Sequence, residues 1–163
     1  MRARTLGGLT ALAVLAADQA TKLAAERHLV VGAKPVPLLG QLLSFRLQYN
    51  PGVSFSQLIP NSEAGRWLLL AMILAFTALL AFWLWRARAP LVGLGLGAIV
   101  GGALGNLCDR LVYGKVVDFL DARVFVFNLA DAAINVGVAL LILDWLIAAT
   151  RPAPPSAGRG GES

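Results

Sequence analysis

The run "WLLLAMILAFTALLAFWLW", residues 67 to 85, contains no charged residue. A helix rises about 1.5 Å per residue, and about 20 apolar residues therefore cross the hydrocarbon core of a bilayer, which is roughly 30 Å thick. Trp67 stands at one end of the run, and Trp83 and Trp85 stand at the other, as in the aromatic belts at the two membrane interfaces. This stretch predicts a transmembrane helix.

The composition agrees with a membrane protein: 58% of the 163 residues are hydrophobic and 14% are charged, whereas soluble domains carry about 25% charged residues. The basic residues are scattered singly and form no block interleaved with aromatics, so we expect no nucleic-acid partner despite the net charge of +5. A single Cys108 and a single His28 do not supply a disulfide or a closed zinc site. We expect no metal and no cofactor.

Three further apolar segments complete a predicted bundle of four transmembrane helices, over about 6–25, 67–86, 91–109 and 130–149. The first is ambiguous, because "MRAR" followed by the apolar residues 6–17 is also typical of a cleavable signal peptide. However, the apolar stretch continues through Ala25, and Asp18 and Lys22 lie one helical turn apart, where their charges neutralise each other. We therefore expect a retained helix.

A segment over about 33–60, between the first two spans, predicts a small β-structure outside the membrane. Ser44 to Tyr49 alternates in the manner of a strand, and "NPG" at 50–52 is a turn signal. The tail 151–163 is rich in Pro, Gly and Ser, which predicts disorder. The Arg-dense "RARAP" at 86–90 favours cytoplasmic termini, although other basic residues fall on the opposite side.

The third predicted span carries glycines at every fourth position and then a polar cluster. The glycines are Gly93, Gly97, Gly101 and Gly105. Such a stripe of small residues lets helix backbones approach closely in lipid, and helix packing is its expected role. One step of four further along the stripe is Asp109, with Asn106 and Arg110 beside it. Cys108, within this cluster, is interpreted as a packing residue.

Helices that alternate in direction place this cluster at the same membrane edge as Asp118, in the connection, and as Asn128 and Asp131, at the start of the fourth span. The connection is long enough to reverse and bring Asp118 opposite Asp131. Two carboxylates a few Å apart share one proton, so one can deprotonate a water while the other donates to a peptide carbonyl. This pair predicts peptide hydrolysis without a metal or a nucleophilic side chain.

Five segments, in order, resemble the signature boxes of bacterial lipoprotein signal peptidase (signal peptidase II): "DQATK" (18–22), "NPGVSF" (50–55), "GNLCDR" (105–110), "VVDF" (116–119) and "FNLAD" (127–131). The resemblance covers about 6–149. It implies a mainly α membrane protein: an inner-membrane aspartyl endopeptidase with four transmembrane helices, a periplasmic antiparallel β-cradle and cytoplasmic termini, in one peptidase domain over 1–150. It would remove the signal peptide of prolipoproteins just before a cysteine carrying diacylglyceryl. The implied partners are that substrate and membrane lipids, and the protein would be a monomer.

The resemblance also assigns roles box by box. Asp118 and Asp131 match the catalytic dyad. Other matched positions line the substrate site: Asn50, Gly52, Asn106, Arg110 and Asn128. Asp18 and Lys22 match structural positions. Asp109 also lies in a family box and is an alternative candidate for the dyad. We favour a structural ion pair with a nearby Arg, because an acid beside a cation is a poor proton donor.

Several residues and functions have a second interpretation. Four apolar side chains border the acyl chains of the substrate or face lipid as interface anchors: Phe119, Leu120, Phe125 and Phe127. Asp121 is interpreted as a solvated loop charge, and Asp144 as an interfacial residue beside Trp145.

A proton-coupled transporter or channel predicts an acid in the middle of a span, whereas the acids here lie near helix ends. A non-enzymatic assembly factor gives no reason for two acids in apolar surroundings.

Overall fold

The computed structural model describes residues 2–40, 42–52 and 62–150. Within these ranges the chain forms four long helices and four short strands. The helices are α1 (Ala3–His28), α3 (Glu63–Arg86), α4 (Pro90–Tyr113) and α5 (Leu129–Ala149). The strands are β1 (Val36–Leu39), β2 (Leu43–Asn50), β3 (Val116–Asp121) and β4 (Val126–Phe127). The predicted mainly helical class with a small antiparallel sheet is confirmed.

Among the described residues, three helices, α3, α4 and α5, are long and apolar enough to cross a membrane. The predicted spans 67–86, 91–109 and 130–149 fall within them. Helix α1 has 26 residues, with Asp18 and Lys22 buried in its second half. The predicted disordered tail, 151–163, lies outside the described residues.

Helix α4 is the centre of the bundle, because glycines let two other helices approach it closely. A Cβ added at Gly101 would lie 2.5 Å from the carbonyl oxygen of Ala11 on α1. Gly93 and Gly97 meet the α1 backbone in the same way. The predicted role of the glycine stripe in helix packing is confirmed. A second glycine face of α4, which the sequence did not predict, packs against α5. A Cβ at Gly102 would lie 2.5 Å from the carbonyl oxygen of Ala130, in the first turn of α5.

The sheet has the order β1-β2-β3-β4, with all neighbours antiparallel. The strand expected at 44–49 is confirmed within β2. The sheet is larger than expected from the sequence, because β3 and β4 come from the segment that was interpreted as a connection between helices. Residues of β3 pair with β2, so that Gln48 faces Asp118 and Asn50 faces Val116. Residues 53–60 of the predicted β-segment lie outside the described residues.

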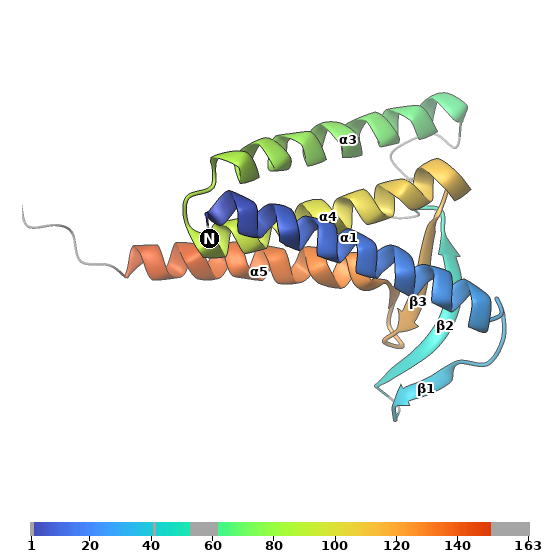
Figure 1. Cartoon of the computed structure of the whole chain (residues 1–163). Helices are drawn as coiled ribbons and strands as arrows, with labels where there is room; N and C mark the ends of the chain where they lie inside the picture. Colours follow the sequence, from blue (N-terminus) through green and yellow to red (C-terminus); the bar gives the residue numbers. More distant parts are fainter. Residues whose placement is uncertain (1, 41, 53–61, 151–163) are drawn as a thin grey trace, which may run out of the picture.

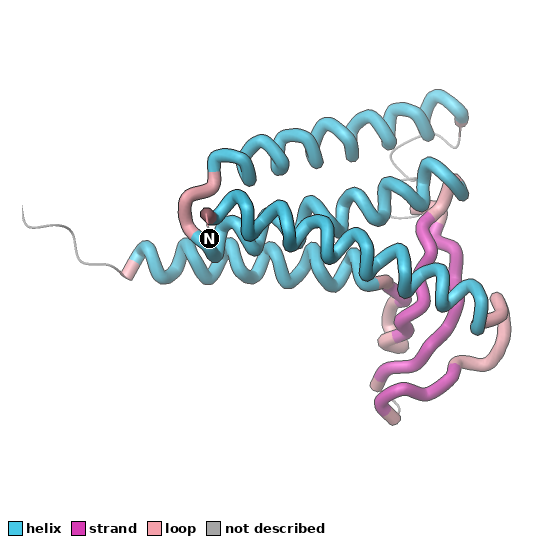
Figure 2. The backbone as a smooth tube through the Cα atoms, viewed as in Figure 1, coloured by secondary structure: helices cyan, strands magenta, loops and turns pink. Residues whose placement is uncertain are grey.

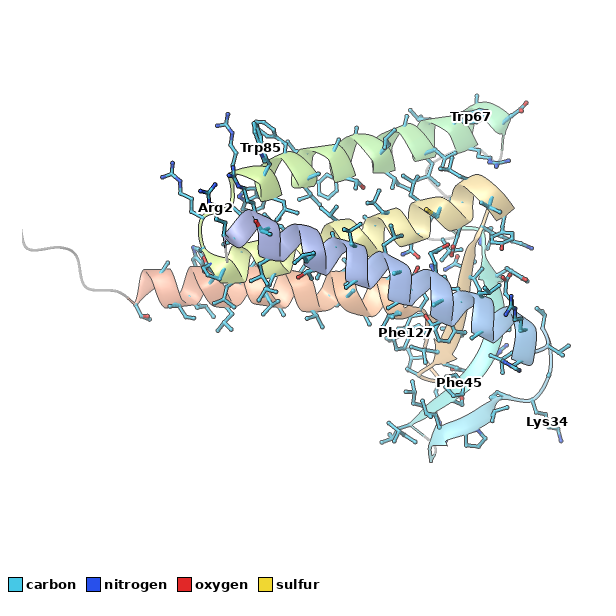
Figure 3. All side chains as sticks on the ribbon, viewed as in Figure 1. Arg2, Lys34, Phe45, Trp67, Trp85 and Phe127 are labelled. Carbon is cyan, nitrogen blue, oxygen red and sulfur yellow. The ribbon has the colours of Figure 1, made fainter. Side chains whose placement is uncertain are left out.

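The sheet projects from one end of the helix bundle, and the N-terminus and the end of α5 lie at the other end (Figure 1). Strands and helices form separate parts of the molecule (Figure 2) that meet where α1 and α4 contact β3. Trp67 and Trp85 mark opposite ends of α3 (Figure 3). The predicted polar cluster therefore lies at the end of the bundle next to the sheet.

Candidate active site

Strand β3 presents Asp118 to the ends of α4 and α5. Successive residues of a strand point to opposite faces. Val117 and Phe119 pack into a hydrophobic cluster with Ala25 of α1 and Leu47 of β2. Asp118 therefore points the other way, and it is only 1% exposed. The alternation of the strand thus turns this carboxyl group toward the ends of α4 and α5, where polar side chains surround it.

Asn128 joins the two acids from its position as the N-cap of α5. Its backbone is extended, and its Oδ1 accepts a 2.9 Å hydrogen bond from the backbone N–H of Asp131. This is the preferred way to satisfy a free N–H in the first helical turn. The same side chain donates from Nδ2 to Oδ1 of Asp118 at 2.7 Å. One buried amide therefore starts the helix that carries Asp131 and also binds Asp118.

Asn106 of α4 completes the connection between the two carboxyl groups. Its Nδ2 donates to Oδ1 of Asp131 at 2.8 Å. Its Oδ1 accepts from Nδ2 of Asn128 and from Nζ of Lys22, each at 3.0 Å. Because both donors contact this oxygen, the amide nitrogen of Asn106 must face Asp131. The structure thus brings Asp118 and Asp131 into one network through two amide side chains.

The position of Asp118 changes its acidity. The pKa of the Asp118 carboxyl is raised from 3.8 to about 6. Burial is the largest cause and the negative charge of Asp131 adds to it, whereas hydrogen bonds from Asn50 and Asn128 and the charge of Lys22 act in the opposite direction. Burial dominates because water no longer solvates the charged form. Asp118 is therefore the member of the pair that is suited to hold a proton.

The remaining predicted substrate-site residues lie around this network. Asn50, at the end of β2, accepts at Oδ1 a 2.9 Å hydrogen bond from the backbone N–H of Gly52, where φ is +85°. A side chain would be strained at that φ, and a Cβ there would lie 3.9 Å from Nη2 of Arg110. Nη1 of Arg110 donates to the carbonyl oxygen of Asn106 at 3.2 Å. The turn at 50–52 and the end of α4 thus face each other beside the two acids.

A second set of charges holds the elements around the site together. Nζ of Lys22 lies 2.8 Å from Oδ2 of Asp18 and 2.8 Å from Oδ2 of Asp109, and all three side chains are buried. Asp18 accepts a hydrogen bond from the N–H of Ala130, in the first turn of α5, and Asp109 accepts one from the N–H of Val117 in β3. The three charges therefore fix α5 and β3 against α1 and α4.

Two interpretations from the sequence are wrong in detail. The cation paired with Asp109 is Lys22, not an Arg, because close packing of α1 on α4 buries the Lys22 ammonium between them. Asp121 is not a solvated loop charge. It is 7% exposed at the end of β3, where it accepts from the N–H of Arg123 at 2.7 Å and lies 3.6 Å from Arg46.

Gln19 was not singled out from the sequence, although it contacts the charged cluster. Its Nε2 donates to Oδ1 of Asp109 at 3.0 Å and to the carbonyl oxygen of Gly105 at 3.2 Å. Its position directly after Asp18, one helical turn before the end of the "DQATK" box, was the only available signal.

The apolar side chains near the site differ in exposure. Phe119 is buried and borders, together with Phe45, a cavity of about 270 Å³ between the end of α1 and the sheet. Phe125 is 61% exposed and its ring centroid lies 5.5 Å from that of Phe127. Both interpretations of these residues, as acyl-chain contacts and as lipid-facing anchors, stay predictions.

Two solved structures with a similar arrangement of helices and sheet are bacterial membrane enzymes. One has a TM-score of 0.76 and 24% sequence identity, with 86% of this chain and 92% of that chain covered. A second has a TM-score of 0.74 and 23% identity, with 93% and 94% covered. At this level of identity the likeness concerns the fold.

Sequence relatives identify the family. The family model described as signal peptidase (SPase) II matches residues 10–147. The lipoprotein signal peptidase of Beijerinckia indica is 46% identical, over 97% of this chain and 99% of its own length. That of Methylocella silvestris is 43% identical, over 100% and 95%. The chain belongs to the signal peptidase II family, as its sequence boxes predict, and it is a protease of a bacterial membrane.

Proposed function

We propose that this protein is an aspartic endopeptidase that removes the signal peptide from diacylglyceryl-modified prolipoproteins, cutting immediately before the lipidated cysteine. One observation carries this proposal: Asp118 and Asp131, from β3 and α5, belong to one hydrogen-bond network through Asn106 and Asn128. The lipoprotein signal peptidases among the relatives support the choice of substrate.

The two carboxyl groups take different roles in the proposed reaction. Asp131, which accepts from the Asn106 amide and is partly accessible, deprotonates the attacking water. Asp118 holds the shared proton and donates it to the carbonyl oxygen of the scissile peptide as the tetrahedral intermediate forms. When the C–N bond breaks, Asp131 gives the proton taken from water to the leaving amine, and Asp118 takes back a proton from a hydroxyl of the tetrahedral intermediate, which becomes the new carboxyl group. The network thus supplies a base and an acid without a nucleophilic side chain.

The proposed substrate-binding residues are Asn50, Gly52, Asn106, Arg110 and Asn128. A signal peptide enters the membrane as a helix, and its scissile bond must leave helical geometry to be attacked. The site lies at the end of the bundle, next to the sheet, where a chain can unwind (Figure 1). Strand β2 and the turn at 50–52 then border the extended segment.

The proposed topology has four spans, with α1 crossing the membrane beside α3, α4 and α5. Both termini lie in the cytoplasm, and the site lies at the outer face of the inner membrane. The arginines that gather around Arg2, at the end of the bundle away from the sheet, support this orientation, because short cytoplasmic segments carry an excess of Lys and Arg. Residues 1–150 form one peptidase domain, which acts as a monomer without metal or cofactor.

Purified Asp118→Asn and Asp131→Asn, presented with a diacylglyceryl-modified precursor, test the dyad. We expect both variants to stay folded in detergent and to lose all detectable cleavage, because each carboxyl group is needed for one proton transfer. Asp144→Asn, at the far end of α5, is the matched control and should cleave normally. Asp109→Asn should unfold more readily, because it leaves Lys22 partly unpaired in a buried site.

Two results would contradict the proposal at different levels. Residual turnover in Asp118→Asn or Asp131→Asn, together with none in folded Asp109→Asn, would reassign the dyad. Failure of the unaltered protein to cleave the lipidated precursor would remove the proposed function.

A further inference from the structure

Four arginines gather at the end of the bundle that lies away from the sheet. Arg2 and Arg4 come from the start of α1, and Arg86 and Arg88 come from the end of α3 and the link to α4. Together with Trp85 they line a hollow of about 620 Å³, called here the arginine hollow. Arg2 and Trp85 lie close to each other at this end of the molecule (Figure 3).

Tertiary packing, not sequence proximity, brings the two pairs of arginines together. Gly93, in the first turn of α4, lies so close to the Ala3 backbone that a Cβ has no room. Close contact of α1 and α4 at this level draws Arg2 and Arg4 toward the link that carries Arg88. In the part of the chain that the structure describes, the ion pairs involve other residues, and none neutralises these four guanidinium groups. The hollow therefore concentrates positive charge that an anion would stabilise.

The arginine hollow continues into an apolar groove. A second hollow of about 360 Å³ shares Arg4 and Trp85 with the first, and it is also lined by Thr5 of α1 and by Ala81 and Leu84 of α3. This shallow groove thus extends from the guanidinium groups along the seam between α1 and α3 as far as Ala81, which is about one helical turn. The cationic hollow and the apolar groove beside it are complementary to a molecule with an anionic phosphate ester and an attached acyl chain.

The position in the membrane indicates where such a molecule comes from. Helix α3 is long and apolar enough to span a bilayer, and Trp85, next to the arginine hollow, is 63% exposed near the end of that helix. Exposed tryptophans at helix ends lie at the level of the lipid headgroups. The arginine hollow therefore opens where phospholipid phosphates lie, with the groove directed toward their acyl chains.

We propose that the arginine hollow and its groove bind one anionic phospholipid, from the leaflet on the side of the bundle away from the sheet. The phosphate lies among the four guanidinium groups, and one acyl chain follows the seam between α1 and α3. A soluble phosphate could meet the same charges but gains nothing from the groove. This site is separate from the proposed peptidase site, and its occupancy does not depend on that function.

Native mass spectrometry of the purified full chain, titrated with phosphatidylglycerol or phosphatidylcholine in neutral detergent, tests the proposal. We expect selective retention of one phosphatidylglycerol. Arg4→Gln/Arg88→Gln should weaken its binding by roughly thirtyfold, because each Lys or Arg near the membrane surface strengthens the binding of an anionic lipid by roughly fivefold and two are removed. Arg27→Gln/Lys34→Gln removes two exposed positive charges at the opposite end and is the matched control, which should bind normally.

The groove is tested separately with Thr5→Phe, which places a ring in the groove from an exposed position. This variant should lose phosphatidylglycerol binding, whereas a parallel titration with glycerol phosphate, which lacks acyl chains, should show only weak binding to both proteins. Retained cleavage activity and an unchanged melting temperature show that the variants are folded. Equal binding of the two lipids, equal effects of the two double variants, or glycerol phosphate binding as tight as phosphatidylglycerol would each overturn the proposal.

Discussion

Four acids lie near one another at the sheet end of the bundle, and the partner of each decides what it can do. Asp18 and Asp109 contact the Lys22 ammonium, and an acid held by a cation is a poor proton donor. Asp118 and Asp131 instead accept hydrogen bonds from neutral amides. This difference in partners supports the proposal that Asp18 and Asp109 hold the fold together, whereas Asp118 and Asp131 exchange a proton with the substrate.

The raised pKa of Asp118 predicts how stability changes with pH. The folded protein, with a pKa of about 6 at Asp118, binds more protons than the unfolded chain, with 3.8. The contribution of this group to stability is therefore present at low pH and is lost as pH rises through about 6. In Asp118→Asn no carboxyl group ionises at this position, so the variant does not lose this stability. The free energy of unfolding of the variant minus that of the unaltered protein should therefore rise by up to ~3 kcal/mol between pH 4 and pH 8.

Thermal unfolding of both proteins in detergent, over this pH range, measures the difference. Asp144→Asn serves as the control for removal of an acid elsewhere. Parallel curves for Asp118→Asn and the unaltered protein, without a pH-dependent gap, would show that burial does not raise the pKa of Asp118.

At the scale of elements, α4 is the helix on which the site is built. Its two glycine faces bring α1 and α5 close enough for Lys22 to contact Asp109, and for Asn106 to contact Asp131. Side chains at these glycines would separate the backbones, because the contacting atoms on α1 are backbone atoms that cannot rotate away. The polar network therefore depends on residues that take no part in it.

Gly101→Ala tests this dependence. An added Cβ would lie 2.5 Å from the carbonyl oxygen of Ala11, so we expect destabilisation by about 1–3 kcal/mol, as for overpacked cores. Gly8→Ala is the matched control, because a Cβ at Gly8 has no neighbour within 4 Å and alanine favours the helix. Melting temperatures should fall for Gly101→Ala and stay equal or rise for Gly8→Ala. Equal shifts in the two variants would contradict the packing argument.

The elements also show how far prediction from the sequence reached. The apolar spans and the strand at 44–49 were predicted because hydropathy and alternation are local patterns. Strand β3 was interpreted as a connection, because it is stabilised by pairing with β2, which lies far away in the sequence. For the same reason Asp121, at the end of β3, was wrongly placed in solvent.

At the scale of the whole molecule, the sheet lies at one end of the bundle and the arginine hollow lies at the other. The proposed orientation places the sheet at the outer face of the inner membrane and the arginine hollow at the cytoplasmic face. Lys34 lies near the sheet, whereas Arg88 lies at the other end with the N-terminus (Figures 1 and 3).

Labelling of single cysteines in intact cells tests this orientation. In a Cys108→Ala background, Lys34→Cys should react with a maleimide that does not cross the membrane. Arg88→Cys should react only after the cells are permeabilised, because the membrane shields the cytoplasmic side. The opposite pattern would reverse the proposed topology, and labelling of both before permeabilisation would contradict the span assignment.

The sequence by itself determined the apolar spans of α3, α4 and α5, the packing stripe of α4, the family and the set of candidate acids and amides, since each depends on residues close together in the chain or on short ordered boxes. The tertiary structure decided that Lys22 pairs with both Asp18 and Asp109, that Asn106 and Asn128 join Asp118 to Asp131, and that four arginines meet in one hollow. These contacts join segments far apart in sequence, and their energies depend on burial and distance, which arise only when the helices and the sheet have packed.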